Sequence, residues 1–157
     1  MKFLPTEALL IKGKGESDTS KINAWDNALL DANIANLNFV AYTSILPKDV
    51  KFRDFRNELI PGQEVKVVIS KIFGKKGNTL TAGLAYVFTD ACGLIAKFAE
   101  KCKDNCVEEK LRKIIDEMIR NRKLNVKDMK IETEKMEVNK SFGCVFVAIL
   151  FNPNNYR

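Results

Sequence analysis

The sequence predicts an α+β fold in which two helices pack on the outside of a largely antiparallel sheet system. About seven segments have the apolar patterns of strands, and short turns separate most of them. Only two segments repeat apolar residues at helical spacing. Residues 142–151 are nearly all apolar, as is typical of a central strand buried on both faces. The 157 residues are expected to form one domain over residues 1–157.

The first two expected elements are a strand and a helix. Residues 6–12 form an apolar run that predicts a buried strand, and the polar residues 13–20, with two glycines, predict a loop. Thr19 or Ser20 is then placed to cap a helix over residues 21–33. The expected apolar face of this helix consists of Ile22, Trp25, Leu29 and Ala32 or Asn33.

The later elements are strands and turns, interrupted by one long helix. Residues 37–45 are expected to form a single strand, which Pro47 ends. Asn105 and Glu108 have the spacing of a capping box and predict the start of the second helix. The other expected strands cover residues 64–73, 79–89, 92–99, 128–138 and 142–151, with an irregular loop over 48–57 and a tail from 152.

Composition excludes several kinds of site. The chain contains no histidine, so Ser-His and Cys-His nucleophilic pairs are absent and acid–base chemistry falls to carboxylates, Lys, Tyr or Cys. The four cysteines include no CxxC pair, so we expect no metal site built on cysteines. We expect reduced thiols, with a disulfide between Cys102 and a neighbour as the alternative.

Charge and hydropathy favour a cytoplasmic protein with neither a nucleic-acid nor a membrane partner. The net charge is +6, but the basic residues are spread out and lack interleaved aromatics, which favours a solvated surface. No apolar run approaches the roughly 18 residues of a membrane span. The apolar stretch near residue 1 is short for a signal peptide.

Thr43 and Ser44 lie side by side near the end of the expected strand over 37–45. Such a pair is usually a turn, but a serine can also attack the carbonyl of the residue before it and form an ester. Elimination then breaks the chain and leaves the serine as dehydroalanine, which water hydrolyses to a pyruvoyl group at the new N-terminus. That reaction needs a polarised peptide bond more than a strong base, which suits a chain without histidine.

Two further polar residues have positions that invite a role. Asp26 borders the apolar face of the first helix, with Ile22 and Leu30 one turn away, so it should meet a cation or solvent. Asn38 and Ser44 share one face of the expected strand but are too far apart along it to touch. A bend or a neighbouring subunit would be needed for them to cooperate.

The whole chain resembles the pyruvoyl-dependent arginine decarboxylase family. Five motifs carry the resemblance in order over nearly the full length. They are Leu4-Pro5 with residues 23–30, residues 36–38, residues 42–47, residues 92–95 and residues 142–146.

The resemblance implies an αββα sandwich assembled as a homotrimer or higher oligomer, with active sites between subunits. It implies self-cleavage into residues 1–43 and 44–157, with Thr43 supplying the scissile carbonyl and Ser44 the pyruvoyl cofactor. Asn38 matches the asparagine that supports cleavage. Asp26 matches the aspartate that holds the substrate guanidinium, a pairing suited to bidentate hydrogen bonds.

One position departs from the family. A glutamate that donates a proton in the family is replaced by Lys97, a residue of different charge and reach. A desolvated Lys97 could act as an acid, or it could repel a cationic substrate. Glu100 has the opposite strand parity and could substitute only through a bulge.

Two functions are therefore weighed. The first is a decarboxylase that converts arginine to agmatine and carbon dioxide, a reaction of polyamine biosynthesis. The second is a non-catalytic paralogue that keeps the fold and oligomer and pairs with an active homologue as a structural or regulatory subunit. A basic nucleic-acid-binding domain is a third and weaker hypothesis.

Overall fold

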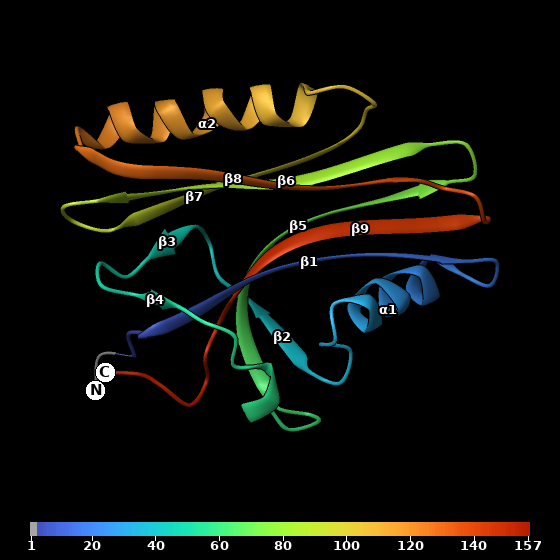
Figure 1. Cartoon of the computed structure of the whole chain (residues 1–157), viewed down its shortest axis with the longest axis horizontal. Coiled ribbons are helices and arrows are strands. Elements are labelled where there is room, and N and C mark those ends of the chain that lie inside the picture. Colours follow the sequence, from blue (N-terminus) through green and yellow to red (C-terminus); the bar gives the residue numbers. More distant parts are fainter. Residues whose placement is uncertain (1–2) are drawn as a thin grey trace.

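The computed structural model describes residues 3–157, which form four stacked layers (Figure 1). Helix α1 (Lys21–Asp31) covers a five-stranded sheet, and helix α2 (Cys106–Arg122) covers a four-stranded sheet on the opposite side. Most strand pairs are antiparallel, and both helices lie outside. The predicted α+β sandwich is therefore confirmed. No helix of residues 3–157 is long and apolar enough to cross a membrane.

The five-stranded sheet is built around the most apolar strand. Its order is β2 (Asn38–Ala41), β5 (Glu64–Lys75), β9 (Phe142–Phe151), β1 (Glu7–Ser17) and β4 (Lys51–Phe52). Strand β9 pairs antiparallel with β1 on one side and β5 on the other, and every residue after Phe142 is buried. The prediction of a central strand buried on both faces is confirmed, because β9 has a sheet partner on each edge and a packed layer on each face.

The four-stranded sheet carries the other helix. Its order is β3 (Ile45–Leu46), β7 (Gly93–Lys101), β6 (Thr79–Thr89) and β8 (Val126–Glu137). Strand β8 is at the edge, as predicted, and most of its residues are exposed or half-buried. Residues 48–57, predicted to be irregular, contain β4 and the short 3-10 turn Arg56–Glu58.

Apolar side chains fill all three spaces between the layers. The space between the two sheets holds Leu46, Val68, Leu84, Ile95, Val147 and Ile149. Helix α1 packs on the first sheet through Ala24, Ala28 and Leu29, and α2 packs on the second through Val107, Leu111 and Ile115. Burial of this kind stabilises a fold by roughly 25 cal/mol per Å² of apolar surface.

The predicted loop over residues 13–20 was wrong, because β1 continues through Ser17. The two glycines that suggested a loop are positions where α1 crosses the strand closely. A Cβ at Gly15 would lie 2.3 Å from the backbone nitrogen of Ala28, and one at Gly13 would lie 2.4 Å from the Ala28 carbonyl oxygen. Glycine is therefore required here for helix-on-strand packing, and the helix starts after its Ser20 cap, whose side chain accepts from Asn23 N.

The predicted apolar face of α1 was partly wrong. Trp25 and Leu29 face the first sheet as expected, and the Trp25 ring contacts Phe146 edge-to-face at 5.3 Å. Ile22, however, is 76% exposed, because Ala24 and Ala28 take the positions nearest the sheet. The helix is thereby turned so that Ile22, Asp26 and Leu30 share its outward side.

The expected single strand over residues 37–45 was also wrong. Its first part is β2 in the five-stranded sheet, and its last residue begins β3 in the four-stranded sheet. Residues 42–44 join the two and belong to neither sheet. The chain therefore crosses between the layers at the Thr43–Ser44 position.

Helix α2 begins where predicted but is capped differently. Asn105 makes no side-chain hydrogen bond to the helix, so the predicted capping box with Glu108 is wrong. A disulfide instead links Cys106, the first helical residue, to Cys102. The structure thus contains the disulfide at Cys102 that was the alternative to reduced thiols.

Candidate active site

The crossing between the sheets is held at both ends by backbone hydrogen bonds. Tyr42 N donates to Val67 O of β5 at 2.8 Å, which fixes the chain to the first sheet. Ile95 N of β7 donates to Ser44 O at 2.8 Å, which fixes it to the second. The Thr43–Ser44 peptide bond lies between these anchors, with Thr43 exposed and Ser44 half-buried. The bond is therefore accessible and held in place without being part of a sheet.

A groove of about 420 Å³ follows the crossing on its open side. It is lined by Phe3, Leu4, Pro5, Ala41, Tyr42, Thr43, Ile45 and Pro47. Most of these side chains are apolar, and Ile45 is 41% exposed. A largely apolar hollow beside a reactive backbone position can hold the aliphatic part of a small ligand or an apolar surface of a partner.

Two tyrosines and a lysine lie next to the crossing. The Tyr42 ring packs 5.4 Å from Phe151, and Lys66 Nζ lies 5.9 Å from the Tyr42 ring and 5.2 Å from the Tyr156 ring. Burial and the neighbouring Tyr42 raise the pKa of Tyr156 to about 12, so its phenol stays protonated at neutral pH. Sequence reasoning missed Tyr156, because it belongs to a tail whose backbone bridge to Pro5 has no local sequence signal.

Lys97 lies on the strand that anchors Ser44. It is two residues beyond Ile95 on β7, so the two side chains point to the same face of the strand, and Lys97 is exposed. Strand β3 covers β7 only at Gly93 and Leu94, which leaves the edge of β7 open beside Lys97. The structure thus brings Lys97 to the neighbourhood of Ser44.

Glu100 does not share that position. The pairing of β6 with β7 runs in continuous register from Leu80–Lys101 to Phe88–Gly93, so β7 has no bulge there. Side chains alternate along the strand, and Glu100 therefore lies on the face opposite Lys97. The bulge that Glu100 would need to replace Lys97 is absent from this strand.

Asn38 is separated from Ser44 within one chain. Its Nδ2 donates to Gly62 O at 2.8 Å, and its backbone nitrogen donates to Gln63 O at 2.9 Å, which holds the start of β2. The chain is extended from Asn38 to Tyr42, a span of roughly 13 Å, and the Asn38 amide is held at the far end of that span by Gly62.

Asp26 is also remote from the crossing. Helix α1 packs on β1 and β9, whereas Ser44 is anchored to β7 in the other sheet. Asp26 is exposed on the outward side of α1, so within one chain it meets solvent, one of the two environments expected for it, and it does not border a buried face. Its helix neighbours Ile22 and Leu30 are 76% and 57% exposed, which gives this carboxylate an apolar border open to solvent.

The possible metal ligands lie elsewhere. Within residues 3–157, the one group of three such side chains is Glu100, Cys102 and Cys106, at the end of β7. Cys92 and Cys144 are free thiols, and burial raises the pKa of Cys144 to about 12, which makes it unreactive. The crossing itself presents the groups that a serine-derived pyruvoyl group requires, a serine and an accessible carbonyl before it.

Comparison with known proteins gives one consistent result. Residues 7–155 match the family described as pyruvoyl-dependent arginine decarboxylase (PvlArgDC). The protein of that name from Pyrococcus horikoshii is 29% identical over 153 residues, which cover 95% of this chain and 96% of the relative. The one from Methanothermobacter thermautotrophicus is 28% identical over 142 residues, covering 89% and 93%. The one from Methanocaldococcus jannaschii is 30% identical over 115 residues, covering 71% and 68%.

Proposed function

Because the chain belongs to the pyruvoyl-dependent arginine decarboxylase family, we propose that it cleaves itself between Thr43 and Ser44 and decarboxylates arginine to agmatine. The observation that supports this most directly is the crossing between the sheets. A peptide bond that is anchored on both sides and accessible between them can react without loss of the surrounding fold. The product would be used in polyamine biosynthesis, in the cytoplasm.

Self-processing would begin within one chain, at Thr43 and Ser44. The Ser44 hydroxyl attacks the Thr43 carbonyl carbon, and the Ile95 amide, which donates to the Ser44 carbonyl, keeps the residue in place during the reaction. Threonine differs from serine at position 43 only in its side chain, and the reaction needs its carbonyl. The resulting pyruvoyl group supplies an electron sink for the carboxylate that leaves the substrate.

Two residues would act on the substrate. Asp26 accepts two parallel hydrogen bonds from the guanidinium of arginine, a charge-assisted pair with well-defined geometry. Lys97, at the position of the family's proton donor, gives a proton to the carbon that loses carbon dioxide. Both assignments rest on the match of each position to the family, and on the location of Lys97 beside the Ser44 anchor.

The separation of these residues supports an oligomeric site. Within one chain, Ser44 is anchored to β7, the strand that carries Lys97, in the four-stranded sheet. Asp26 and Asn38 lie on α1 and β2, which belong to the side of the five-stranded sheet. Each location has exposed apolar side chains, namely Ile22 and Leu30 around Asp26, Val40 near Asn38 and Ile45 beside Ser44. Exposed apolar residues that gather on one surface can mark a contact with a partner. A homotrimer or larger homo-oligomer, in which α1 and β2 of one subunit face the crossing of the next, would complete the site.

The mass of the denatured protein tests self-processing. We expect two fragments divided between Thr43 and Ser44 in the wild type, and a single full-length chain in Ser44→Ala. A wild-type chain that stays intact would rule out a pyruvoyl enzyme.

Release of carbon dioxide from arginine tests the activity of the cleaved protein. We expect release by the wild type and none by Ser44→Ala. Cleavage without release would leave a processed but inactive protein and favour the second candidate.

That second candidate is a non-catalytic paralogue, and Lys97 is the observation that favours it. A lysine replaces the glutamate, and its positive charge opposes binding of a cationic substrate. Such a protein would keep the oligomer and support an active homologue as a structural or regulatory subunit. Replacing Lys97 with Glu distinguishes the two hypotheses. The variant gains activity if the wild-type site has lost its proton donor, and it loses activity if Lys97 donates the proton.

A further inference from the structure

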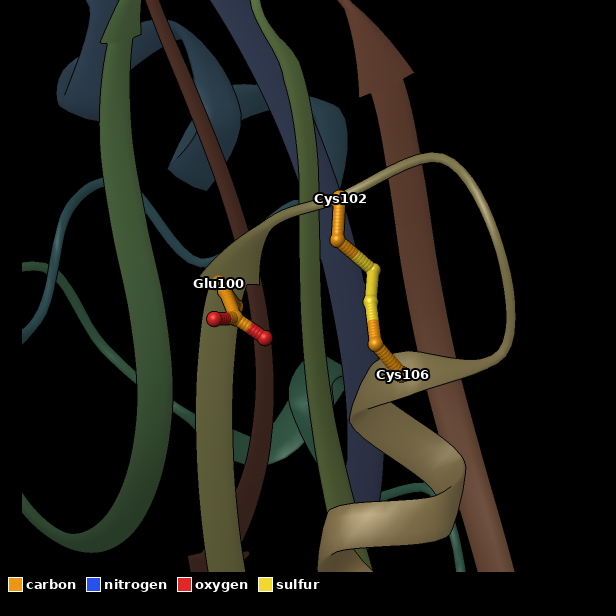
Figure 2. A group of neighbouring side chains, drawn as sticks. All are labelled: Glu100, Cys102 and Cys106. Carbon is orange, nitrogen blue, oxygen red and sulfur yellow. A yellow bond between two sulfur atoms is a disulfide. The ribbon is translucent and has the colours of Figure 1, made fainter.

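The connection between β7 and α2 gathers three side chains that bind metal ions in other proteins. Glu100 is near the end of β7, Cys102 follows the strand, and Cys106 is the first residue of α2. A disulfide joins the two cysteines, whose Cα atoms are 6.6 Å apart. The two sulfur atoms and a carboxylate oxygen of Glu100 all lie within 4.8 Å of one another (Figure 2).

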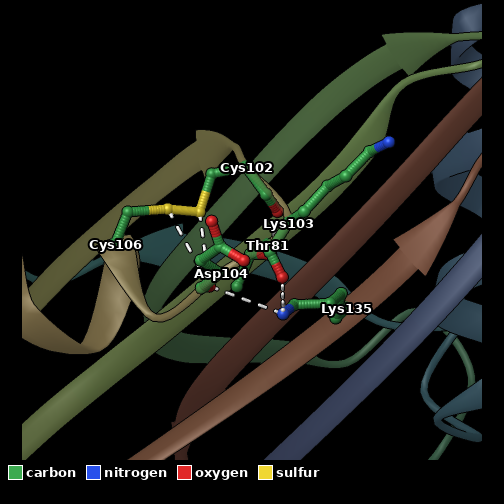
Figure 3. The surroundings of a disulfide bond; sticks show 6 residues. All are labelled: Thr81, Cys102, Lys103, Asp104, Cys106 and Lys135. Atoms are coloured by element: carbon green, nitrogen blue, oxygen red, sulfur yellow. Dashed lines mark hydrogen bonds between the residues drawn. A yellow bond between two sulfur atoms is a disulfide. The ribbon is translucent and has the colours of Figure 1, made fainter.

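Neighbouring strands hold this connection by contacts that do not involve sulfur. Thr81 Oγ1 on β6 donates to Cys102 O at 3.0 Å. Lys135 Nζ on β8 donates to Lys103 O at 2.5 Å and reaches Asp104 O at 3.5 Å (Figure 3). Because these hydrogen bonds do not depend on the disulfide, reduction should leave the two cysteines beside each other.

The reduced state also has a partner for its thiol hydrogens. The carbonyl oxygen of Asp104 lies 3.5 Å from Cys102 Sγ and 3.9 Å from Cys106 Sγ (Figure 3). Disulfide sulfur atoms have no hydrogen to donate, whereas two thiols can both donate to this oxygen. The loop is thus suited to a pair of thiols as well as to a disulfide.

We propose that the reduced Cys102–Cys106 pair and Glu100 form a binding site for a thiophilic divalent metal ion such as Zn²⁺, and that the disulfide closes this site. Zinc binds thiolates at about 2.3 Å and carboxylates at about 2.0–2.2 Å, so its ligand atoms lie roughly 3.3–3.8 Å apart in a tetrahedron. Small side-chain rotations bring the three ligand atoms from their present spacing to that one. A water molecule completes four-fold coordination.

Two steps lead from the disulfide to the metal complex. A dithiol reductant breaks the sulfur–sulfur bond, gives the cysteines two electrons and two protons, and becomes a disulfide itself. The metal ion then forms two bonds to sulfur and one to Glu100, and the two thiol protons leave to solvent. The bound group carries a net charge of −1, which the nearby Lys135 ammonium and the N-terminal end of α2 stabilise.

This site is separate from the candidate active site. Glu100 lies on the face of β7 that α2 covers, and Lys97 lies on the opposite face. The spacing of the cysteines alone carries no zinc signature. The missing ligand is a carboxylate two residues before Cys102, on the same side of the strand.

Cobalt binding by the full-length wild type tests the proposal without any substitution. The protein is reduced with a dithiol, freed of reductant under inert gas, and titrated with Co²⁺. We expect one equivalent to bind with tetrahedral visible bands and thiolate-to-cobalt charge-transfer absorption, and Zn²⁺ to displace it. The oxidised protein should show neither band. Reduced protein without charge-transfer absorption would overturn the proposal.

Three variants then assign the ligands. Cys102→Ser should weaken binding by at least about 100-fold, because changes even outside the ligand sphere cost 10- to 100-fold. Cys92→Ser, which removes a free thiol outside the cluster, should bind as the wild type does. Glu100→Gln should weaken binding about tenfold and keep the charge-transfer absorption. Charge-transfer absorption that survives in Cys102→Ser, or is lost in Cys92→Ser, would place the metal elsewhere, and unchanged affinity in Glu100→Gln would remove Glu100 from the site.

Discussion

The two helices cover equivalent faces of the sandwich, but their outward sides differ. On α2, the exposed positions are charged or polar, among them Lys113, Asp116 and Glu117. On α1, the exposed side carries Ile22 and Leu30 with Asp26 between them. A charged outer side is typical of a helix that faces solvent, whereas an apolar outer side is typical of a helix that packs against another surface. The difference is the one expected if, as proposed, α1 faces a neighbouring subunit and α2 faces solvent.

A charge introduced on the outer side of α1 tests whether this side contacts a neighbouring subunit. We expect Leu30→Glu to raise the concentration needed for half-assembly by at least about 30-fold, because a residue at the centre of an interface can contribute about 2 kcal/mol or more. Lys113→Glu on α2, a larger change in charge, should leave assembly unchanged. Sedimentation velocity over a dilution series measures both. Equal behaviour of the two variants would show that α1 does not face a neighbouring subunit.

Carboxylates on the two helices should differ in their effect on the reaction with arginine. We expect Asp26→Asn to lower kcat/KM for arginine by about 10- to 100-fold, because hydrogen bonds to charged groups contribute roughly 1.5–3 kcal/mol. Self-cleavage should be unchanged, since Asp26 lies away from the Thr43–Ser44 bond. Asp116→Asn, the matched change on α2, should have no effect on either reaction. Normal arginine turnover by Asp26→Asn would remove this residue from substrate binding.

The glycines beneath the helices should differ in stability effect. A Cβ at Gly15 meets α1 backbone at 2.3 Å, whereas one at Gly83 meets side chains of Leu111, Thr133 and Val107 at 2.8–3.0 Å. Side chains can rotate and a helix backbone cannot, so Gly15→Ala should cost about 2–3 kcal/mol and Gly83→Ala about 1 kcal/mol. Urea unfolding measures both. A larger cost at Gly83 would contradict the closer docking of α1.

Acid should loosen the α1 side of the fold by a smaller amount. Glu7 on β1 accepts hydrogen bonds from Arg53, Asn152 and Asn155, and these contacts, with that of Arg53 the strongest, lower its pKa from 4.5 to about 2 despite partial burial. The folded pKa is below the unfolded one, so this contribution to stability is complete above pH 4.5 and is lost as the pH falls toward 2.

Trp25 is the single tryptophan and lies on α1, so its fluorescence reports unfolding of this side. The denaturation midpoint should fall over that pH range in the wild type. The fall should be smaller in Glu7→Gln, which cannot titrate. Identical pH profiles for the two proteins would assign the acid sensitivity to other carboxylates.

The sequence predicted best those features that depend on burial alone. Residues 142–151 are nearly all apolar, and a central strand with a packed layer on each face buries them. Residues 37–45 were predicted as one strand but form parts of two, because nothing in their pattern marks the point where the chain changes sheets. The pattern of apolar residues indicates which side chains are buried, but it does not indicate which sheet buries them.

The candidate site was predicted in its residues but not in its geometry. The Thr43–Ser44 pair was evident from the sequence and Lys97 from the family resemblance. The hydrogen bond from Ile95 N to Ser44 O, two residues from Lys97, is visible only in three dimensions. Ile22 was predicted to lie in the core because helical spacing alone does not show which apolar residues of a helix face the sheet and which stay exposed. The metal-ligand cluster was missed because its ligands are of two residue types.

Strand β1 has a consequence for a chain that is cut after Thr43. It lies inside its sheet, paired with β9 from Ala8 opposite Phe151 to Ser17 opposite Phe142, and with β4 on its other edge. The two resulting polypeptides would be interleaved, since removing the shorter one would take away an inner strand and helix α1 together. Cleavage would therefore yield a permanent two-chain complex. The new terminus at residue 44 would stay tethered through Ile45 and Leu46 to β7.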